Sequence, residues 1–149
     1  MGLIMKIRDI DRGDIPACAV VFMKVFNAEP WGDYWDLETA GRRLADITMT
    51  PGFHGILAEE DGRVVGFVMG CAEQWYSGMH FHIREMCVAA ASQRRGVGTA
   101  LLEALFVHLV EMDTEAVSLL TRRDSPAAEF YLRRGFRIGE NMVWMGQRI

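Results

Sequence analysis

The chain has 149 residues, of which 50% are hydrophobic and 24% are charged, the usual composition of one globular domain. This composition excludes a disordered, collagen-like or coiled-coil protein, and no apolar run reaches the ~20 residues of a membrane span. Sixteen basic and 20 acidic residues give a formal net charge of −4, which disfavours a nucleic-acid partner and slightly favours a cationic substrate. We therefore expect a single domain over residues 1–149, with no nucleic acid and no membrane among its partners.

The cysteines and histidines do not predict a metal site. Cys18, Cys71 and Cys87 are far apart and no C-x-x-C pair occurs, so neither a zinc site nor a disulfide framework is expected. His80 and His82 share one face of an expected strand, but no third ligand is identifiable. Reduced thiols, together with an N-terminus that lacks the apolar core of a signal peptide, predict a cytoplasmic protein without metal.

The first part of the chain predicts one strand followed by two helices. Residues 3–9 form a short β-rich run. Asp11 or Asp14 is a suitable N-cap for a helix that ends near Phe26, with apolar residues at helical spacing. Asp36 is a suitable N-cap for the second helix.

The hydrophobic period then changes from that of a helix to that of strands. Residues 53–60 and 63–74 are β-rich and are joined at Asp61-Gly62, a typical hairpin turn. A third β-rich run covers residues 79–89. The remaining expected elements are, in chain order, a helix over 96–112, a central strand over 116–121, a helix that begins at Ser125-Pro126 and ends at Arg134, and two closing strands over 135–139 and 141–149. This order predicts an α/β or α+β domain with a mixed sheet.

The segment between the third β-rich run and the long helix is suited to bind a phosphate. Gly96 and Gly98 permit positive φ angles and a close approach of the backbone, so that several N–H groups can converge at the start of the helix. Arg94 and Arg95 could add charged hydrogen bonds to phosphate oxygens. A plain glycine-rich turn is the alternative at this point. The spacing fits neither a Walker A loop nor a complete dinucleotide fingerprint, because Leu101 stands where the last glycine would be.

Two linked motifs resemble the GNAT N-acetyltransferase family. Glu85–Val88 followed by Gln93–Gly98 resembles the family's Q/R-x-x-G-x-G/A signature after its fourth strand. Residues 124–136 (DSPAAEFYLRRGF) resemble its second motif, N-x-x-A-x-x-x-Y-x-x-x-G-F, except that Asp124 replaces the frequent asparagine. The resemblance implies an α/β (α+β) GNAT-like fold: a mixed, mostly antiparallel central sheet, flanked by about four helices and splayed between the fourth and fifth strands.

The resemblance also implies acetyl-coenzyme A (acetyl-CoA) as the acyl donor and no metal. Its pyrophosphate would contact the glycine loop, and its pantetheine arm would pair with the backbone of the preceding strand. The implied cofactor-binding residues are Met86, Cys87, Val88, Gln93, Arg94, Arg95, Gly96, Val97, Gly98, Thr99 and, with a side-chain contact that the substitution puts in doubt, Asp124. Asp124 could instead only cap the following helix. Family analogy suggests a homodimer.

Three residues are candidates for the proton transfers of amine acetylation. An alkylammonium has a pKa near 10, so it must lose a proton before it attacks the thioester. Tyr131, at the family's tyrosine position, is the candidate acid near the sulfur, and its alternative role is aromatic packing. Glu85 and His82 compete for the role of base. These two residues point to opposite faces of the strand unless a β-bulge lies between them, and the family resemblance implies such a bulge.

The acceptor site is expected near two aromatic groups. Trp31, Tyr34 and Trp35 lie in a loop with acidic residues, and Trp75 lies near Glu73. Aromatic faces and carboxylates suit a cationic amine, although such aromatics also anchor loops over a core. The predicted function is therefore acetyl-CoA-dependent transfer of acetyl to a primary amine of a small molecule or peptide. The alternative is a regulatory module that binds acetyl-CoA without catalysis.

Overall fold

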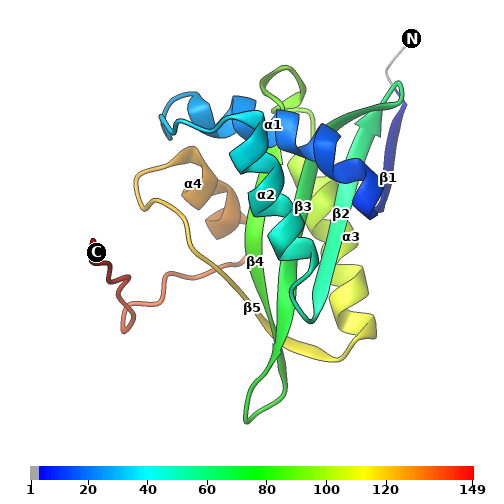
Figure 1. Cartoon of the computed structure of the whole chain (residues 1–149). Coiled ribbons are helices and arrows are strands. Elements are labelled where there is room, and N and C mark those ends of the chain that lie inside the picture. The colour runs from blue at the N-terminus through cyan, green and yellow to red at the C-terminus, as the bar shows by residue number, and fades with distance from the viewer. Residues whose placement is uncertain (1–3) are drawn as a thin grey trace.

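The computed structural model describes residues 4–149, so residue 3 of the predicted first strand lies outside the described residues. The elements form one mixed sheet with helices on both faces (Figure 1). In chain order they are β1 (Met5–Asp9), a 3-10 turn (Arg12–Asp14), α1 (Ile15–Asn27), α2 (Leu37–Thr48), β2 (Phe53–Glu60), β3 (Arg63–Gln74), β4 (Met79–Val88), a 3-10 turn (Ala90–Ser92), α3 (Val97–Glu111), β5 (Thr114–Leu119) and α4 (Pro126–Arg133).

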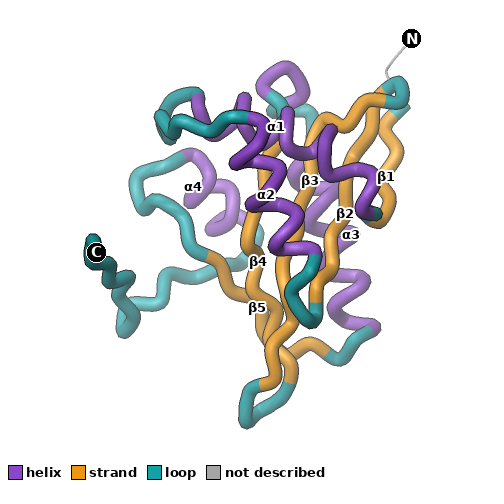
Figure 2. Tube along the Cα trace, in the orientation of Figure 1, coloured by secondary structure: helices purple, strands orange, loops and turns teal. Residues whose placement is uncertain are grey.

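The strands are arranged in the order β1-β2-β3-β4-β5. The three pairings from β1 to β4 are antiparallel, and β4 pairs with β5 in parallel. The parallel pair requires a crossover, which α3 supplies. Figure 2 shows α1 and α2 in front of the sheet and α3 behind it. The predicted mixed, mostly antiparallel sheet with four helices is confirmed.

Two apolar cores fill the spaces between these layers. One core lies between the sheet and α1 and α2, and includes Phe22, Leu44 and Phe67. The other core lies between the sheet and α3, and includes Phe81 and Leu105. Alternate residues of each strand serve the two cores, because successive side chains of a strand point to opposite faces. Both faces of the central strands are therefore apolar, which explains their nearly continuous hydrophobic runs.

The helix starts follow the predicted capping chemistry. Asp36 accepts a hydrogen bond from the Thr39 backbone N–H at 2.8 Å, and the Asp36 backbone N–H donates to Thr39 Oγ1 at 3.2 Å, so α2 begins with a capping box. Asp11 caps the 3-10 turn that leads into α1, and the Asp14 carboxylate accepts from the Asp11 backbone N–H in the same capping box, but as N-cap of α1 Asp14 makes no side-chain capping bond. Ser125 caps α4 by accepting from the Ala128 N–H at 3.2 Å. The suggestion that Asp124 caps α4 is therefore wrong.

The sheet opens between β4 and β5, as predicted. The parallel ladder ends where Ile83 lies opposite Leu119, but β4 continues to Val88. Within the described sheet, the outer edge of β4 over Arg84–Val88 has no strand partner. Backbone N–H and C=O groups that point outward along this edge can bind an extended ligand, although the Val88 carbonyl already accepts from Gln93 Nε2 at 2.9 Å. We call residues Arg84–Val88 the open edge.

The two closing strands expected over 135–139 and 141–149 are wrong. These residues form no strand and leave the body of the molecule (Figure 1, orange-red to red). Trp144 and Met145 are 77% and 84% exposed. The apolar pattern shows that these side chains favour a β-strand. A strand forms only where a neighbouring strand can pair with it through backbone hydrogen bonds. In the described residues, no helix has both the length and the apolarity that crossing a membrane requires.

Candidate active site

The glycine loop between β4 and α3 presents its backbone to the solvent at the start of α3. Gly96 occupies the N-cap position with φ of 81°, and Arg94 also has a positive φ of 62°. The first N–H groups of α3 have no partner inside the helix and lie at the positive end of the helix dipole. A side chain at Gly96 would meet open space, so the glycine is needed for its backbone angle. Gly98 differs, because a Cβ there would lie 3.3 Å from the Phe130 ring.

Several side chains of this loop form hydrogen bonds with other parts of the protein. The Arg95 guanidinium donates to the buried Glu60 carboxylate at 2.6 Å, which anchors the loop to β2. Gln93 Nε2 donates to the Val88 carbonyl at 2.9 Å, and Thr99 Oγ1 accepts from Arg134. Arg94 is exposed. An anion bound at this loop would therefore be held mainly by backbone N–H groups, with Arg94 as the exposed cation beside it.

A β-bulge in β4 brings the two candidate bases onto one face of the sheet. Ile83 lies opposite Gly70 of β3, and Glu85 lies opposite the preceding residue, Met69. Arg84 is thus the extra residue of the bulge. His82 precedes the bulge and Glu85 follows it, so both side chains face α2 and line the same cavity. Without the extra residue, Glu85 would point toward α3.

Gly70 allows this bulge to form. A Cβ at Gly70 would collide with the backbone carbonyl of His82 and lie 2.8 Å from the Phe81 ring. The strands therefore approach too closely at this point for any side chain. The sequence places a glycine in the middle of β3 for this reason.

Glu85 is a mostly buried carboxylate with one arginine partner. Arg43 of α2 donates to Glu85 Oε1 at 2.9 Å, and the Glu85 side chain is 14% exposed. Burial raises the pKa of Glu85 above its ordinary value, while Arg43 and then Arg84 lower it in part. The carboxylate of Asp33, in the α1–α2 loop, raises the pKa of Glu85 further. A carboxylate with a raised pKa is a stronger base than an exposed one.

His82 is half-buried beside Glu85 but lies farther from the open edge. Its ring Nδ1 is 2.9 Å from Ser118 Oγ of β5, so one nitrogen is engaged in the paired part of the sheet. Burial, followed by Arg84, lowers the pKa of His82 below its ordinary value, and Glu73 opposes this in part. The ring is therefore neutral near pH 7 and can accept a proton.

Tyr131 of α4 is a buried aromatic residue near Cys87 and Glu85 of the open edge. It is 8% exposed and packs edge-on against Phe130 and Phe136, each with ring centroids 5.3 Å from its own. Burial raises the pKa of the Tyr131 hydroxyl, and Cys87 and Glu85 raise it further. The hydroxyl is therefore fully protonated at neutral pH and lies near the carboxylate of Glu85. This geometry is compatible with a packing role for the Tyr131 ring and with a role of its hydroxyl as a hydrogen-bond donor.

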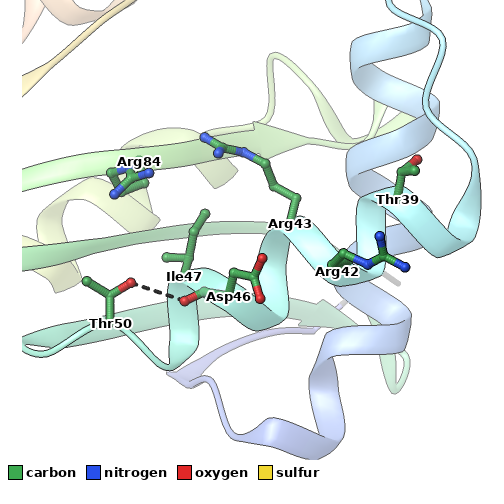
Figure 3. A pocket seen from close by; sticks show the side chains of 7 residues that line it. All are labelled: Thr39, Arg42, Arg43, Asp46, Ile47, Thr50 and Arg84. Atoms are coloured by element: carbon green, nitrogen blue, oxygen red, sulfur yellow. Dashed lines mark hydrogen bonds between the residues drawn. The ribbon is translucent and has the colours of Figure 1, made fainter.

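Two adjoining cavities lie next to Glu85. One, of about 540 Å³, is lined by Arg43, His82, Ile83, Arg84, Glu85 and Leu120. The other, of about 290 Å³, is lined by Thr39, Arg42, Arg43, Asp46, Ile47, Thr50 and Arg84. Figure 3 shows Arg43 extending from α2 toward the strand that carries Arg84. These two arginines belong to both cavities, which makes the space beside Glu85 cationic.

The predicted aromatic acceptor residues do not gather in these cavities. Trp35 packs edge-on against Phe22 at 4.9 Å and donates from Nε1 to Asp33 at 3.0 Å, while Trp31 packs against Phe26. These two tryptophans anchor the α1–α2 loop. Tyr34 is fully exposed in the same loop.

Trp75 stacks on His80 in the β3–β4 hairpin, with ring centroids 5.1 Å apart. In Figure 1 this hairpin lies at the lower end of the sheet, whereas the α1–α2 loop lies near the upper end. Trp75 and the α1–α2 loop therefore do not form one aromatic surface. Asp124 is exposed and lies 3.5 Å from the Arg122 guanidinium.

Arg43 and Arg84 were not predicted as site residues. Arg43 lies 42 residues before its partner Glu85, and no local motif connects them. The available signal is the helical spacing of Thr39, Arg43 and Ile47, which share one face of α2. That face becomes a cavity wall only once α2 is known to cover β4.

The fold agrees with the similarity of this chain to known proteins. The model of the acetyltransferase (GNAT) family matches residues 16–136, so the chain belongs to this family. An N-alpha-acetyltransferase of Sulfurisphaera tokodaii is 34% identical over 91 residues. That match covers 54% of this chain and 54% of that protein, so the chain spans about half the length of the curated relative.

Solved structures share the fold at low sequence identity. An aminoglycoside acetyltransferase from a soil metagenome, solved with trehalose, superposes with a TM-score of 0.76 at 21% identity, covering 97% of this chain and 96% of its own. An aminoglycoside N-acetyltransferase solved with CoA gives a TM-score of 0.75 at 15% identity, covering 100% of this chain and 98% of its own. At these identities the likeness concerns the fold alone.

Proposed function

We propose that the protein is an acetyl-CoA-dependent N-acetyltransferase that transfers acetyl directly to a primary amine of a small molecule or peptide. The observation that carries the proposal is that three features follow one another along the chain, from β4 to the start of α3. The mostly buried carboxylate of Glu85 lies near the start of the open edge, the open edge leads into the glycine loop, and the loop ends at the start of α3. A donor with a pyrophosphate, an extended arm and a terminal thioester requires these features in this order.

The residues present are compatible with the donor at each point. The free N–H groups at the start of α3 suit the pyrophosphate, because a helix start favours an anion. The unpaired backbone of Met86 to Val88 suits the amides of an extended arm, which would add to β4 like a short strand. The thioester would then lie between Glu85 and Tyr131. Acetyl-CoA supplies an activated acetyl group, and the protein supplies position and proton transfer.

Glu85 is the proposed base. It removes a proton from the incoming ammonium, and the neutral nitrogen attacks the thioester carbonyl. The new bond joins nitrogen to carbon, the carbon–sulfur bond breaks with its electron pair leaving on the thiolate, and the nitrogen loses its second proton to solvent as it becomes the amide. We favour Glu85 over His82 because Glu85 lies on the open edge and near Tyr131, whereas His82 pairs opposite Ser118 in the closed part of the sheet. A backbone N–H of the open edge can stabilise the oxyanion that forms on the carbonyl.

Tyr131 is the proposed partner of the departing thiolate. A thiol has an ordinary pKa near 8.5, and burial raises the pKa of Tyr131 above its ordinary value. Complete proton transfer from the tyrosine to the thiolate is therefore unfavourable at equilibrium. The hydroxyl would instead donate a hydrogen bond that strengthens as negative charge develops on sulfur.

The alternative function is acetyl-CoA binding without turnover. Such a module needs the loop and the open edge, but it does not need a buried carboxylate held by Arg43 beside them. A thiol-release assay over a panel of primary amines separates the two. Release of CoA that depends on the amine, with an acetylated amine identified by mass spectrometry, supports the enzyme. Calorimetric binding of acetyl-CoA without release on any amine supports the regulatory module.

A further inference from the structure

The two cavities beside Glu85 differ from what a polycationic acceptor requires. Three arginines line the smaller cavity, and Asp46 is its one acidic lining residue. In the larger cavity, Arg43 and Arg84 face the single carboxylate of Glu85. A second ammonium group placed here would be repelled by the guanidinium groups at short range.

The arginines are not equally free to bind a ligand. Arg42 pairs with Glu38 at 3.0 Å, and Figure 3 shows it at the far end of the cavity from Arg84. Arg43 uses Nε and one terminal nitrogen on Glu85. Among the described residues, no carboxylate forms an ion pair with Arg84, although this side chain lines both cavities. Arg84 therefore carries the uncommitted positive charge of this site.

The bulge places this charge directly beside the proposed base. Arg84 is the extra residue between Ile83 and Glu85, so its side chain and that of Glu85 leave consecutive positions of β4 toward the same cavity. A small ligand can therefore contact both groups at once. Glu85 attracts an ammonium group, while Arg84 and the remaining donors of Arg43 match the oxygens of a carboxylate or phosphate.

We infer that the acceptor is a small zwitterionic amine, whose carboxylate or phosphate group binds Arg84 and Arg43 while its amine faces Glu85. This inference rests on the proposed function and specifies its substrate class. It also departs from the slight preference for a cationic substrate that the net charge of −4 suggests. The charge of the whole chain is spread over its surface, whereas specificity depends on the few groups that line the cavity.

The test compares amines that differ only in the group distant from the nitrogen. For each of several spacer lengths, the series contains an amino acid, a phosphorylated amino alcohol, the plain amino alcohol and the diamine, such as β-alanine, phosphoethanolamine, ethanolamine and propane-1,3-diamine. We expect kcat/KM for the carboxylate or phosphate member at the best spacer to exceed that of the amino alcohol by about 10-fold or more, the effect of one charged hydrogen bond. The two anionic members distinguish a carboxylate from a phosphate.

Variants of Arg84 assign the preference to this residue. In Arg84→Gln the ratio between the anionic and neutral members should fall toward one, and in Arg84→Glu the preference should move to the diamine. Arg63→Gln is the control, because Arg63 is exposed at the start of β3, whereas Arg84 lies opposite the middle of that strand, and the change should leave every ratio unchanged. A wild-type preference for the diamine, or an anion preference that survives in Arg84→Gln, would overturn the inference while leaving N-acetyltransfer intact.

A binding measurement separates failure of this inference from failure of the proposed function. If no amine releases CoA, the proposed function fails. Calorimetric titration of the CoA complex with N-acetyl-β-alanine and with N-acetylethanolamine then still reports on the cavity. Tighter binding of the acid, lost in Arg84→Gln, supports the anion site. Equal binding of the two ligands contradicts it.

Discussion

The donor end and the acceptor end of the site use different parts of the polypeptide. The proposed donor end consists of the glycine loop and the open edge, whose backbone N–H and C=O groups would face acetyl-CoA. The proposed acceptor end consists of charged side chains from α2 and β4, placed by a bulge. The backbone groups are the same whatever the sequence, so the donor end depends on shape. The acceptor end depends on which side chains are present, and it is where substrate specificity can change without loss of donor binding.

The largest effect that this contrast predicts is loss of donor binding in Gly96→Asp. Gly96 has a positive φ and open space around its Cβ position, so the new carboxylate would project into the cradle and repel the pyrophosphate. We expect acetyl-CoA binding to become undetectable by calorimetry. Gly96→Asn is the matched control, because asparagine has nearly the same shape, tolerates positive φ and carries no charge. Equal affinity of the folded aspartate and asparagine variants would show that no anion binds there.

The substitution Gly70→Ala should impair the acceptor end alone. The added Cβ collides with the His82 carbonyl and forces β4 away at the bulge, which displaces Glu85. We expect turnover to fall by about 10²-fold, the usual contribution of a positioned base, while acetyl-CoA affinity changes little. Gly41→Ala is the control, since Gly41 lies in α2 with nothing near its Cβ position. Circular dichroism of both variants verifies folding, and an equal loss of acetyl-CoA affinity in Gly70→Ala would contradict the separation of the two ends.

The interface between the two ends is tested by Tyr131→Phe. The change keeps the ring and its packing against Phe130 and Phe136, and it removes only the hydroxyl. Turnover should fall about 10- to 1,000-fold while acetyl-CoA affinity remains, because the hydrogen bond strengthens only as charge develops on sulfur. Steady-state kinetics on an amine for which chemistry limits the rate provide the measurement. Unchanged turnover would leave Tyr131 with a packing role alone.

The smallest predicted effect concerns stability and lies outside both ends. His54 of β2 stacks on His108 of α3 with ring centroids 3.5 Å apart, and burial followed by His108 lowers the pKa of His54. The folded state therefore disfavours protonation of His54. Neutral His54 contributes fully to stability above the pKa of about 6.5 that it has in the unfolded chain, and this contribution is lost as the pH falls below that value.

Thermal unfolding between about pH 8 and about pH 5 tests this assignment. The melting temperature of His54→Gln should fall less steeply with acidification than that of the wild type. Parallel curves for the two proteins would remove His54 from the pH dependence. The same curves show which part of any activity profile reflects unfolding rather than chemistry.

The contrast also explains which parts of the molecule could be predicted from the sequence. Capping residues such as Asp36 and Ser125, the Asp61-Gly62 turn and the glycine loop act through neighbouring residues, so the sequence shows them directly. The pairing of Arg43 with Glu85 depends on how α2 covers β4, which no local pattern specifies. The tryptophans are predicted at the acceptor site because their chemistry suits a cation, and the structure adds that Trp35 anchors its loop by packing against Phe22.

The C-terminal segment shows the limit of side-chain patterns for predicting strands. Met142 to Met145 form an apolar run with high strand preference, yet these residues are exposed and unpaired in the described structure. A hydrophobic period predicts the kind of element that a segment favours. Whether that element forms depends on a partner strand elsewhere in the fold.

The pH dependence of kcat/KM tests most directly whether the bulge turns Glu85 into the catalytic base. Profiles are compared for the wild type, Glu85→Gln and His82→Gln with one amine that the wild type acetylates. Glu85→Gln should lower turnover by roughly 10²-fold or more and remove the acidic limb of the profile, whereas His82→Gln should retain that limb. Near wild-type turnover with an unchanged acidic limb in Glu85→Gln would contradict the assignment, and loss of the limb in His82→Gln would transfer the role to the histidine.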